Sequence, residues 1–232
     1  MGMTGVSNLK ARAVLLMVGL LATLLLLALS ACGGGGSAQE EVKARPLPED
    51  PKALRPGEYR STEFKPSFSF RVGKGWRTSS EFPQVSDKLA ITRGEYEPPR
   101  LLIFRDLQEV YKYDKTGTTL AVVKAPEDMV GWFQHHPDLE TEKPEPVTVG
   151  GVKGLQVDYI LSEDATYDDI NLFRYTDGSD GSAGKGFKYR AIILEDVEGK
   201  TVTIGIGNPT IGFDDLLAEA QKVLDTVKWE GS

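Results

Sequence analysis

The chain has a single cysteine, Cys32, in 232 residues, and this scarcity excludes an intramolecular disulfide. A domain of this chain must therefore be stabilised by its hydrophobic core alone. Histidine is nearly as rare, because His135 and His136 are the only two. The G-x-S-x-G motif of serine hydrolases is missing as well. These absences leave few candidates for catalysis, and we expect neither an enzyme nor a cofactor.

Positive charge is in deficit too, since 27 Lys and Arg face 34 Asp and Glu, for a net charge of −7 at pH 7. Removal of residues 1–31 would take away Lys10 and Arg12 but no acidic residue, which leaves a net charge of −9. Such an acidic protein is repelled by the phosphates of nucleic acid and of anionic lipid headgroups. We therefore expect no nucleic-acid partner.

The N-terminal stretch has the order of a secretory signal. Residues 1–12 are polar and basic, residues 13–29 are almost wholly apolar, and two small residues follow. The tetrad Leu29-Ser30-Ala31-Cys32 resembles the lipobox of bacterial lipoproteins. The resemblance implies cleavage between Ala31 and Cys32 and acylation of the Cys32 thiol, which would anchor the protein on the extracytoplasmic side of the cell membrane. The alternative is a retained membrane-spanning helix, which typically needs roughly 20 apolar residues.

Residues 32–62 predict an extended, solvated tether. A glycine run opens this segment, and residues 38–60 are charged and carry four prolines with little apolar periodicity. A tether of about 30 residues spans roughly 30 Å, enough to lift a domain off the lipid surface. Residues 63–232 are then expected to form a single domain that buries about 70% of its unfolded surface.

Alternating apolar and polar residues predict most of the strands. The predicted strands are 68–72, 89–92, 101–104, 145–149, 154–161, 186–195 and 201–207, with 120–123 either a strand or a loop. The last two of the seven should form a hairpin around Glu198-Gly199. Two helices are predicted, one between Pro126 and Pro137 and one over 213–229, where an apolar stripe follows the 3.6-residue period. The fold class is therefore α+β, with a largely antiparallel sheet covered by helices.

Three segments carry a family resemblance. "FSFRVGKGW" at 68–76, "VTVGGVKGLQVDY" at 147–159 and a final amphipathic helix ending "VLDTVKW" at 223–229 resemble the Mog1/PsbP-like α/β/α sandwich. The likeness covers about residues 63–230, and many envelope lipoproteins resemble the same group. The group includes photosystem II extrinsic subunits and a nuclear transport factor, but no functional residue of either can be matched to this chain.

Three polar stretches could bind a ligand. "HHPDLE" at 135–140 lacks metal-site spacing, because adjacent residues do not share a helix face, and a polar helix end is the simpler interpretation. The acidic segment 163–185 could offer oxygen ligands to calcium but lacks the EF-hand ladder, so it predicts a long solvated connection or a lid at the rim of a pocket. "GIGNPTIG" at 205–212 lacks the spacing of a phosphate-binding loop and predicts a turn and a helix cap.

The residues that we expect at a ligand site are Trp76, Trp132, Tyr167, Asp168 and Asp169, although tryptophans in a sandwich with a single core are more often packing residues. The resulting hypothesis is a non-enzymatic binding or accessory module of the cell envelope, held to the membrane by its N-terminal lipid. Its partner would be an envelope protein, a lipid or a glycan. The alternatives are an envelope hydrolase that uses histidine or carboxylate catalysis, and a structural spacer without a specific ligand.

Overall fold

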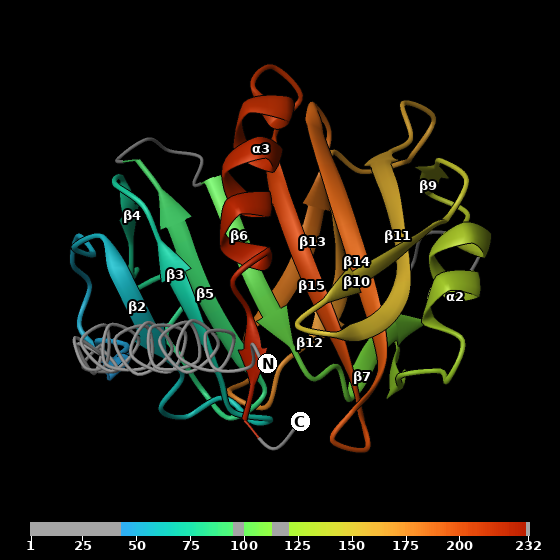
Figure 1. Cartoon of the computed structure of the whole chain (residues 1–232). Coiled ribbons are helices and arrows are strands. Elements are labelled where there is room, and N and C mark those ends of the chain that lie inside the picture. Colours follow the sequence, from blue (N-terminus) through green and yellow to red (C-terminus); the bar gives the residue numbers. More distant parts are fainter. Residues whose placement is uncertain (1–42, 95–99, 113–120, 231–232) are drawn as a thin grey trace, which may run out of the picture. The chain divides into compact units, whose positions relative to one another are not determined.

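The computed structural model describes residues 43–94, 100–112 and 121–230 (Figure 1). The predicted signal segment, the cleavage site at Ala31 and the acylation site at Cys32 lie outside the described residues. Within the described ranges, no helix has both the length and the apolar character that crossing a membrane requires.

An antiparallel central sheet organises the fold. Its strands are, in spatial order, β10 (Glu145–Val149), β11 (Val152–Leu161), β14 (Phe187–Val197), β15 (Lys200–Pro209), β6 (Arg100–Arg105), β5 (Lys88–Arg93) and β4 (Trp76–Arg77), with β9 (Leu139–Thr141) also paired to β11. The longest pairing joins β14 to β15, and both strands run from one end of the sheet to the other (Figure 1). Because side chains alternate along a strand, this sheet presents two faces that must both be covered.

Each face of the central sheet is covered by a smaller sheet and one helix. The first layer holds β1 (Arg45–Pro46), β2 (Gly57–Arg60), β3 (Phe68–Val72), β16 (Lys228–Trp229) and α3 (Phe213–Leu224). The second layer holds β13 (Asp180–Gly184), β12 (Asp169–Arg174), β7 (Glu109–Lys112), β8 (Ala121–Lys124) and α2 (Met129–His135). Figure 1 shows α3 lying across the front of the central sheet, with β12 and β13 behind it.

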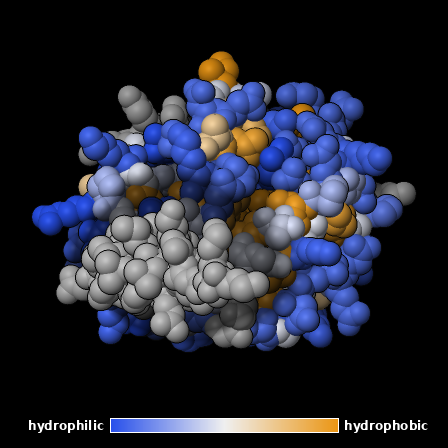
Figure 2. All heavy atoms as spheres, in the orientation of Figure 1, coloured by the Kyte–Doolittle hydropathy of each residue, from blue (hydrophilic) through white to orange (hydrophobic). Residues whose placement is uncertain are grey.

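Two hydrophobic cores follow from the period-2 alternation. On β15, Val202, Ile204 and Ile206 point to the first core, which also contains Leu216 of α3. On β14, Ala191 and Ile193 point the other way, to the second core beneath α2 and β12. The described surface in the view of Figure 2 is mostly hydrophilic, with hydrophobic areas near its middle.

The α+β class and the antiparallel sheet are confirmed, but helices cover less of the sheet than predicted. The described part has two short helices, and strands supply most of both outer layers. The predicted strand 68–72 is β3, and the predicted hairpin turns at Glu198-Gly199, where both residues have positive φ. The first predicted helix is α2, whose start is capped by Asp128, since its carboxylate accepts a hydrogen bond from Gly131 N.

The tether predicted for residues 32–62 is wrong from residue 43 onward. The folded unit begins at Lys43, where β1 pairs with β2 and β2 pairs in turn with β3. Leu47, Leu54 and Tyr59 are buried in the first core. These apolar residues are too widely spaced among prolines to give a periodic signal in the sequence. They are buried by contacts with segments that are distant in the chain, which the sequence pattern does not reveal.

The last helix also ends earlier than predicted. α3 stops at Leu224, and Lys228–Trp229 forms a strand that pairs with β3. Thr226 at the turn accepts a hydrogen bond from Arg71 N through its hydroxyl. Val227 and Trp229 are buried on either side of exposed Lys228, which is a strand alternation. The same spacing also fitted the end of a helical stripe, and this coincidence extended the predicted helix.

The acidic segment 163–185 is a hairpin and not a long loop. β12 and β13 pair antiparallel, and a short turn between Tyr175 and Ser179 joins them. Ile170 and Leu172 point into the second core. The acidic residues and glycines that surround them in the sequence hid this alternation.

Candidate functional site

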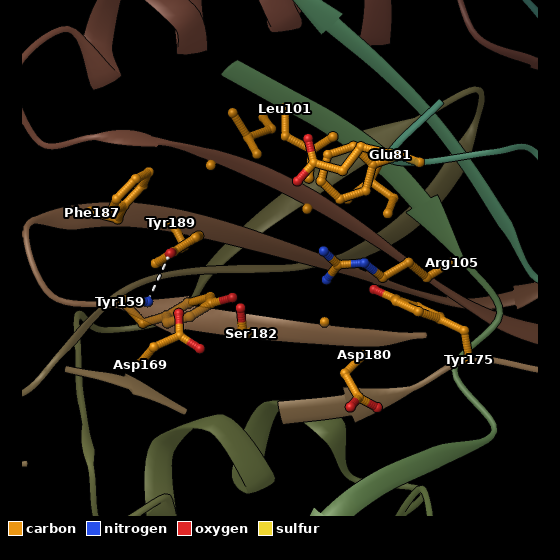
Figure 3. A pocket seen from close by; sticks show the side chains of 17 residues that line it. Glu81, Leu101, Arg105, Tyr159, Asp169, Tyr175, Asp180, Ser182, Phe187 and Tyr189 are labelled. Atoms are coloured by element: carbon orange, nitrogen blue, oxygen red, sulfur yellow. Dashed lines mark hydrogen bonds between the residues drawn. The ribbon is translucent and has the colours of Figure 1, made fainter. Parts of the chain in front are cut away.

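A pocket of about 380 Å³ lies between the central sheet and the β12–β13 hairpin, and we call it the hairpin pocket (Figure 3). Strands β6, β11, β14 and β15 supply its sheet side, and β13 supplies the opposite side. The pocket lies on the same face of the sheet as the second core. A hollow of this size is in the range that accommodates a small organic ligand.

Two glycines of β15 open the floor of the hairpin pocket. A side chain at Gly205 would come within 3.0 Å of an Arg105 guanidinium nitrogen, and one at Gly207 within 2.9 Å of the Tyr189 ring. Contacts that short force a neighbouring group to move. The glycines therefore let the side chains of Arg105 and Tyr189 lie flat against the strand.

Aromatic rings form one wall of the pocket. Tyr159 and Tyr189 stack with ring centroids 5.1 Å apart, and Phe187 stacks on Tyr189 at 6.0 Å. The Tyr189 hydroxyl accepts a hydrogen bond from Gly184 N at 3.0 Å, which ties the wall to the hairpin (Figure 3). Burial raises the pKa of Tyr159 and of Tyr189, so both hydroxyls stay protonated at neutral pH.

The opposite end of the hairpin pocket is polar and holds a buried arginine. Arg105 is 8% exposed, and its Nε has no hydrogen-bond partner among the described residues. Its guanidinium lies 5.0 Å from the Phe173 ring centroid. The hydroxyl of Tyr175 is also buried without a partner in the described part of the chain, and burial raises its pKa. Both residues line the pocket, so two unsatisfied donors meet at one end.

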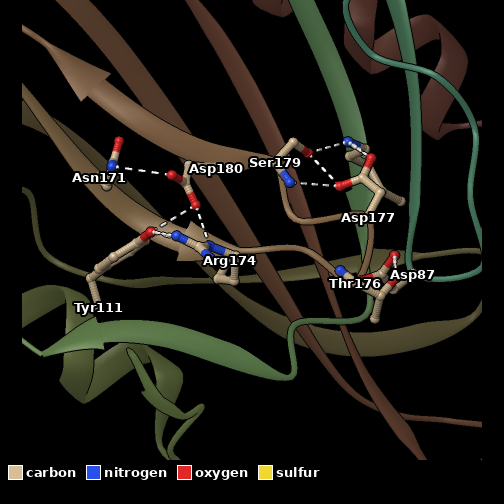
Figure 4. Close-up of polar contacts among 9 residues, drawn as sticks. Asp87, Tyr111, Asn171, Arg174, Thr176, Asp177, Ser179 and Asp180 are labelled. Atoms are coloured by element: carbon tan, nitrogen blue, oxygen red, sulfur yellow. Dashed lines mark hydrogen bonds and ion pairs between the residues drawn. The ribbon is translucent and has the colours of Figure 1, made fainter. Parts of the chain in front are cut away.

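A second buried cation lies beside Arg105. Lys88 is directly opposite Arg105 on the β5–β6 ladder and is 1% exposed. Its Nζ donates to Asp177 Oδ2 at 2.9 Å and to Ser179 Oγ at 2.8 Å. Burial alone would raise the pKa of Asp177, but hydrogen bonds from Ser179 and Lys88 outweigh it and lower the pKa to about 2. Asp177 of the hairpin turn, which Figure 4 shows beside Ser179, thus neutralises Lys88.

Three carboxylates also reach the hairpin pocket, and all three are exposed. Asp180 is held by Arg174 Nε at 2.6 Å and by the Tyr111 hydroxyl at 2.8 Å (Figure 4). Partial burial raises the pKa of Asp169, and a hydrogen bond with Ser182 opposes the rise. Glu81 completes the set. No ion pair joins any of them to Arg105 within the described ranges.

Of the five ligand-site residues expected from the sequence, one lines the hairpin pocket. Asp169 does so, whereas Asp168 points to solvent beside Lys185 and Tyr167 is half exposed. Trp76 is buried in the first core on the other side of the sheet. Trp132 is partly buried and packs against the second core. Both tryptophans are therefore packing residues, as the simpler interpretation of the sequence had it.

Sequence reasoning missed Arg105 and the three tyrosines of the pocket. "RLLIFR" at 100–105 did carry a signal, because it ends an apolar strand with an arginine. Such a residue can lie at a solvated strand end or be buried, and only the position of the β12–β13 hairpin decides between the two. Tyr159 and Tyr189 looked like ordinary alternating residues of two strands that pair with each other.

The two histidines diverge and lie away from the hairpin pocket. His136 is buried, and its Nδ1 accepts a hydrogen bond from Asp138 N. His135 is exposed, with Nδ1 at 2.6 Å from Gly131 O. Across the described residues, including the segment 163–185, no group of three His, Cys, Asp or Glu side chains is placed to hold a metal ion.

No protein-family model matches the chain, and no curated protein matches it. Among solved structures it is similar to LpqN of Mycobacterium tuberculosis, which is involved in cell envelope biogenesis; the identity is 10%, the match covers 77% of this chain and 88% of LpqN, and the TM-score is 0.39. It is also similar to the cyanobacterial PsbP (CyanoP) of Synechocystis sp. PCC 6803, with 14% identity, 76% and 95% coverage and a TM-score of 0.39. CyanoP is a PsbP protein, the group that the sequence resembles. Likenesses this distant carry no inference about function.

Proposed function

We propose that this chain is a non-enzymatic binding module of the cell envelope, held on the extracytoplasmic side of the membrane by lipid on Cys32. Its binding site is the hairpin pocket. The observation that carries the binding role is a hollow with a glycine floor and a stacked tyrosine wall, at whose far end a buried arginine has no counter-ion among the residues that the structure describes. Ligand pockets typically combine an apolar lining with a few polar groups in this way.

The chemistry of the pocket supports binding over catalysis. Its three tyrosines have raised pKa values, so they act as hydrogen-bond donors and not as nucleophiles. Arginine stays protonated in proteins and cannot act as a base. Neither histidine lines the pocket.

The proposed lipid anchor depends on the tetrad Leu29–Cys32, and metabolic labelling with a fatty acid tests it. Cells that express the chain should incorporate an alkyne-bearing fatty acid into the wild type, and Cys32→Ser should lose the label because its hydroxyl is not alkylated. Ser37→Ala, five residues further along, should keep it. Intact-mass analysis that finds residues 1–31 still attached and Cys32 unmodified would overturn the anchor and leave the retained helix.

Filling the hairpin pocket should abolish binding of a neutral aromatic probe. Ser182 lines the pocket and is exposed, so Ser182→Phe adds a ring there without disturbing the core. The full chain in dodecyl maltoside is titrated with 2-naphthamide by calorimetry, against a blank titration into protein-free micelles. We expect the affinity of Ser182→Phe to fall by about tenfold or more, the equivalent of about 1.4 kcal/mol.

The matched control is Thr148→Phe, which places the same ring at an exposed position of β10 outside the hairpin pocket. Its affinity should equal that of the wild type. Equal losses in both variants would mean that the probe binds elsewhere, and the pocket would then not be the binding site.

A further inference from the structure

We propose that the hairpin pocket recognises an anionic group of its ligand, a carboxylate, sulfonate or phosphate, through Arg105, with the Tyr175 hydroxyl as a second donor. This inference rests on the proposed binding function and names the ligand class of the same site. The remainder of the ligand would lie against the tyrosine wall.

Folding leaves the positive charge of Arg105 without a counter-ion among the described residues. Arg105 is more than nine-tenths buried, and its partners in the described part of the chain are aromatic: the Phe173 ring and the side chain of Tyr159. None of these groups carries a negative charge. A buried cation without a counter-ion is costly, and buried charges in proteins are normally paired. A ligand anion would supply the missing charge.

Arg105 differs in this respect from Lys88, its cross-strand neighbour. The hairpin turn brings Asp177 and Ser179 to Lys88 and leaves Arg105 without an equivalent. Two cations on adjacent strands repel each other, and one carboxylate can balance only one of them. The unbalanced cation is the one that lines the pocket.

The geometry of the pocket also places the Arg105 guanidinium where a ligand anion could reach it. Figure 3 shows the Arg105 side chain reaching toward the middle of the pocket, with Tyr175 beside it and the Tyr159–Tyr189 pair at the other end. Gly205 leaves the space in which the guanidinium lies. The planar guanidinium donates two parallel hydrogen bonds to a carboxylate or phosphate, and the free Nε is one of the donors that this fork uses.

The carboxylates around the pocket do not supply this charge. Asp180 is bound by Arg174 and Tyr111, while Asp169 and Glu81 are exposed to water. They screen the site against anions that approach from solution, so a ligand needs its apolar part as well as its charge to enter. The site therefore selects an amphipathic anion over a simple inorganic one.

The test uses a matched pair of probes, 2-naphthoate and 2-naphthamide, which share one ring system and differ in charge. Titration calorimetry of the full chain in dodecyl maltoside, with micelle blanks, should give an affinity for 2-naphthoate about tenfold or more above that for 2-naphthamide. Arg105→Met keeps the volume of the side chain and should make the two affinities equal. Arg105→Lys should keep part of the preference, and Tyr175→Phe should weaken 2-naphthoate more than 2-naphthamide, because a hydrogen bond to a charged acceptor is the stronger one.

Lys185→Met is the control for general charge effects, because Lys185 belongs to the hairpin end but does not line the pocket. It should retain the full preference. Calorimetric unfolding of each variant verifies the fold. If Arg105→Met does not fold, Tyr175→Phe, which removes a single oxygen atom, still tests the anion site. Equal wild-type affinities for the two probes, or a preference that survives Arg105→Met, would overturn the anion site and leave the pocket as a binding site. Binding of neither probe would overturn both.

Discussion

Truncation of Phe68 to alanine is expected to lower the free energy of unfolding by about 4 kcal/mol. Phe68 is fully buried in β3, and its ring lies 4.4 Å from Phe104, 5.0 Å from Trp229 and 5.4 Å from Phe70, measured between centroids. These rings belong to the central sheet, to the last strand and to β3 itself. The residue thus joins the outer layer to the sheet, and the cavity left by its removal would be lined by rigid rings that cannot collapse into it.

Urea unfolding followed by tryptophan fluorescence measures this loss, with Phe187→Ala as the matched control. Phe187 is half-buried and stacks on Tyr189 at the wall of the hairpin pocket. Truncation of Phe187 should lower the free energy of unfolding by about 1 kcal/mol, because a half-buried ring removes less apolar surface from water than a fully buried one. A Phe68→Ala loss no larger than that of the control would show that the first layer does not depend on this cluster.

The position of Phe68 also explains where sequence reasoning succeeded. "FSFRV" alternates strictly, and such alternation identifies a strand whatever its neighbours are. The hairpin of β14 and β15 was equally clear in the sequence, because Glu198-Gly199 separates two long apolar runs. In the structure both turn residues adopt positive φ, as a tight hairpin turn requires. Local pattern and final structure agree wherever one strand contributes a complete set of alternating residues.

Sequence reasoning failed where burial depends on distant partners. Leu47 and Leu54 enter the first core singly, between prolines, with β1 paired parallel to β2. The hairpin pocket is assembled by strands that are up to about a hundred residues apart, and no single stretch contains its pattern. Asp169 lies in an acidic segment, and such a segment is a local signal for a ligand site. Arg105 is the last residue of an apolar strand, and its burial depends on the distant β12–β13 hairpin.

The second large effect concerns acid stability and depends on His136. Burial lowers the pKa of His136 from 6.5 to about 4, and its unprotonated Nδ1 accepts a hydrogen bond from Asp138 N. The folded state therefore holds this side chain neutral, while the unfolded chain binds a proton below pH 6.5. Stability from His136 is complete above pH 6.5 and is lost as the pH falls toward 4. Between these values the free energy of unfolding should decrease by about 3 kcal/mol, at about 1.4 kcal/mol per pKa unit.

Urea unfolding at intervals between pH 7 and pH 4 separates this contribution from the acidic residues. His136→Gln retains an oxygen that can accept from Asp138 N but does not titrate, so its stability should fall much less over the same range. His135→Gln changes the adjacent, exposed ring and should follow the wild-type curve. The Asp177 carboxylate, with a pKa of about 2, loses its stabilising effect only at lower pH, which keeps the two windows apart. Parallel curves for the wild type and His136→Gln would mean that the His136 ring is hydrated and titrates as in the unfolded chain.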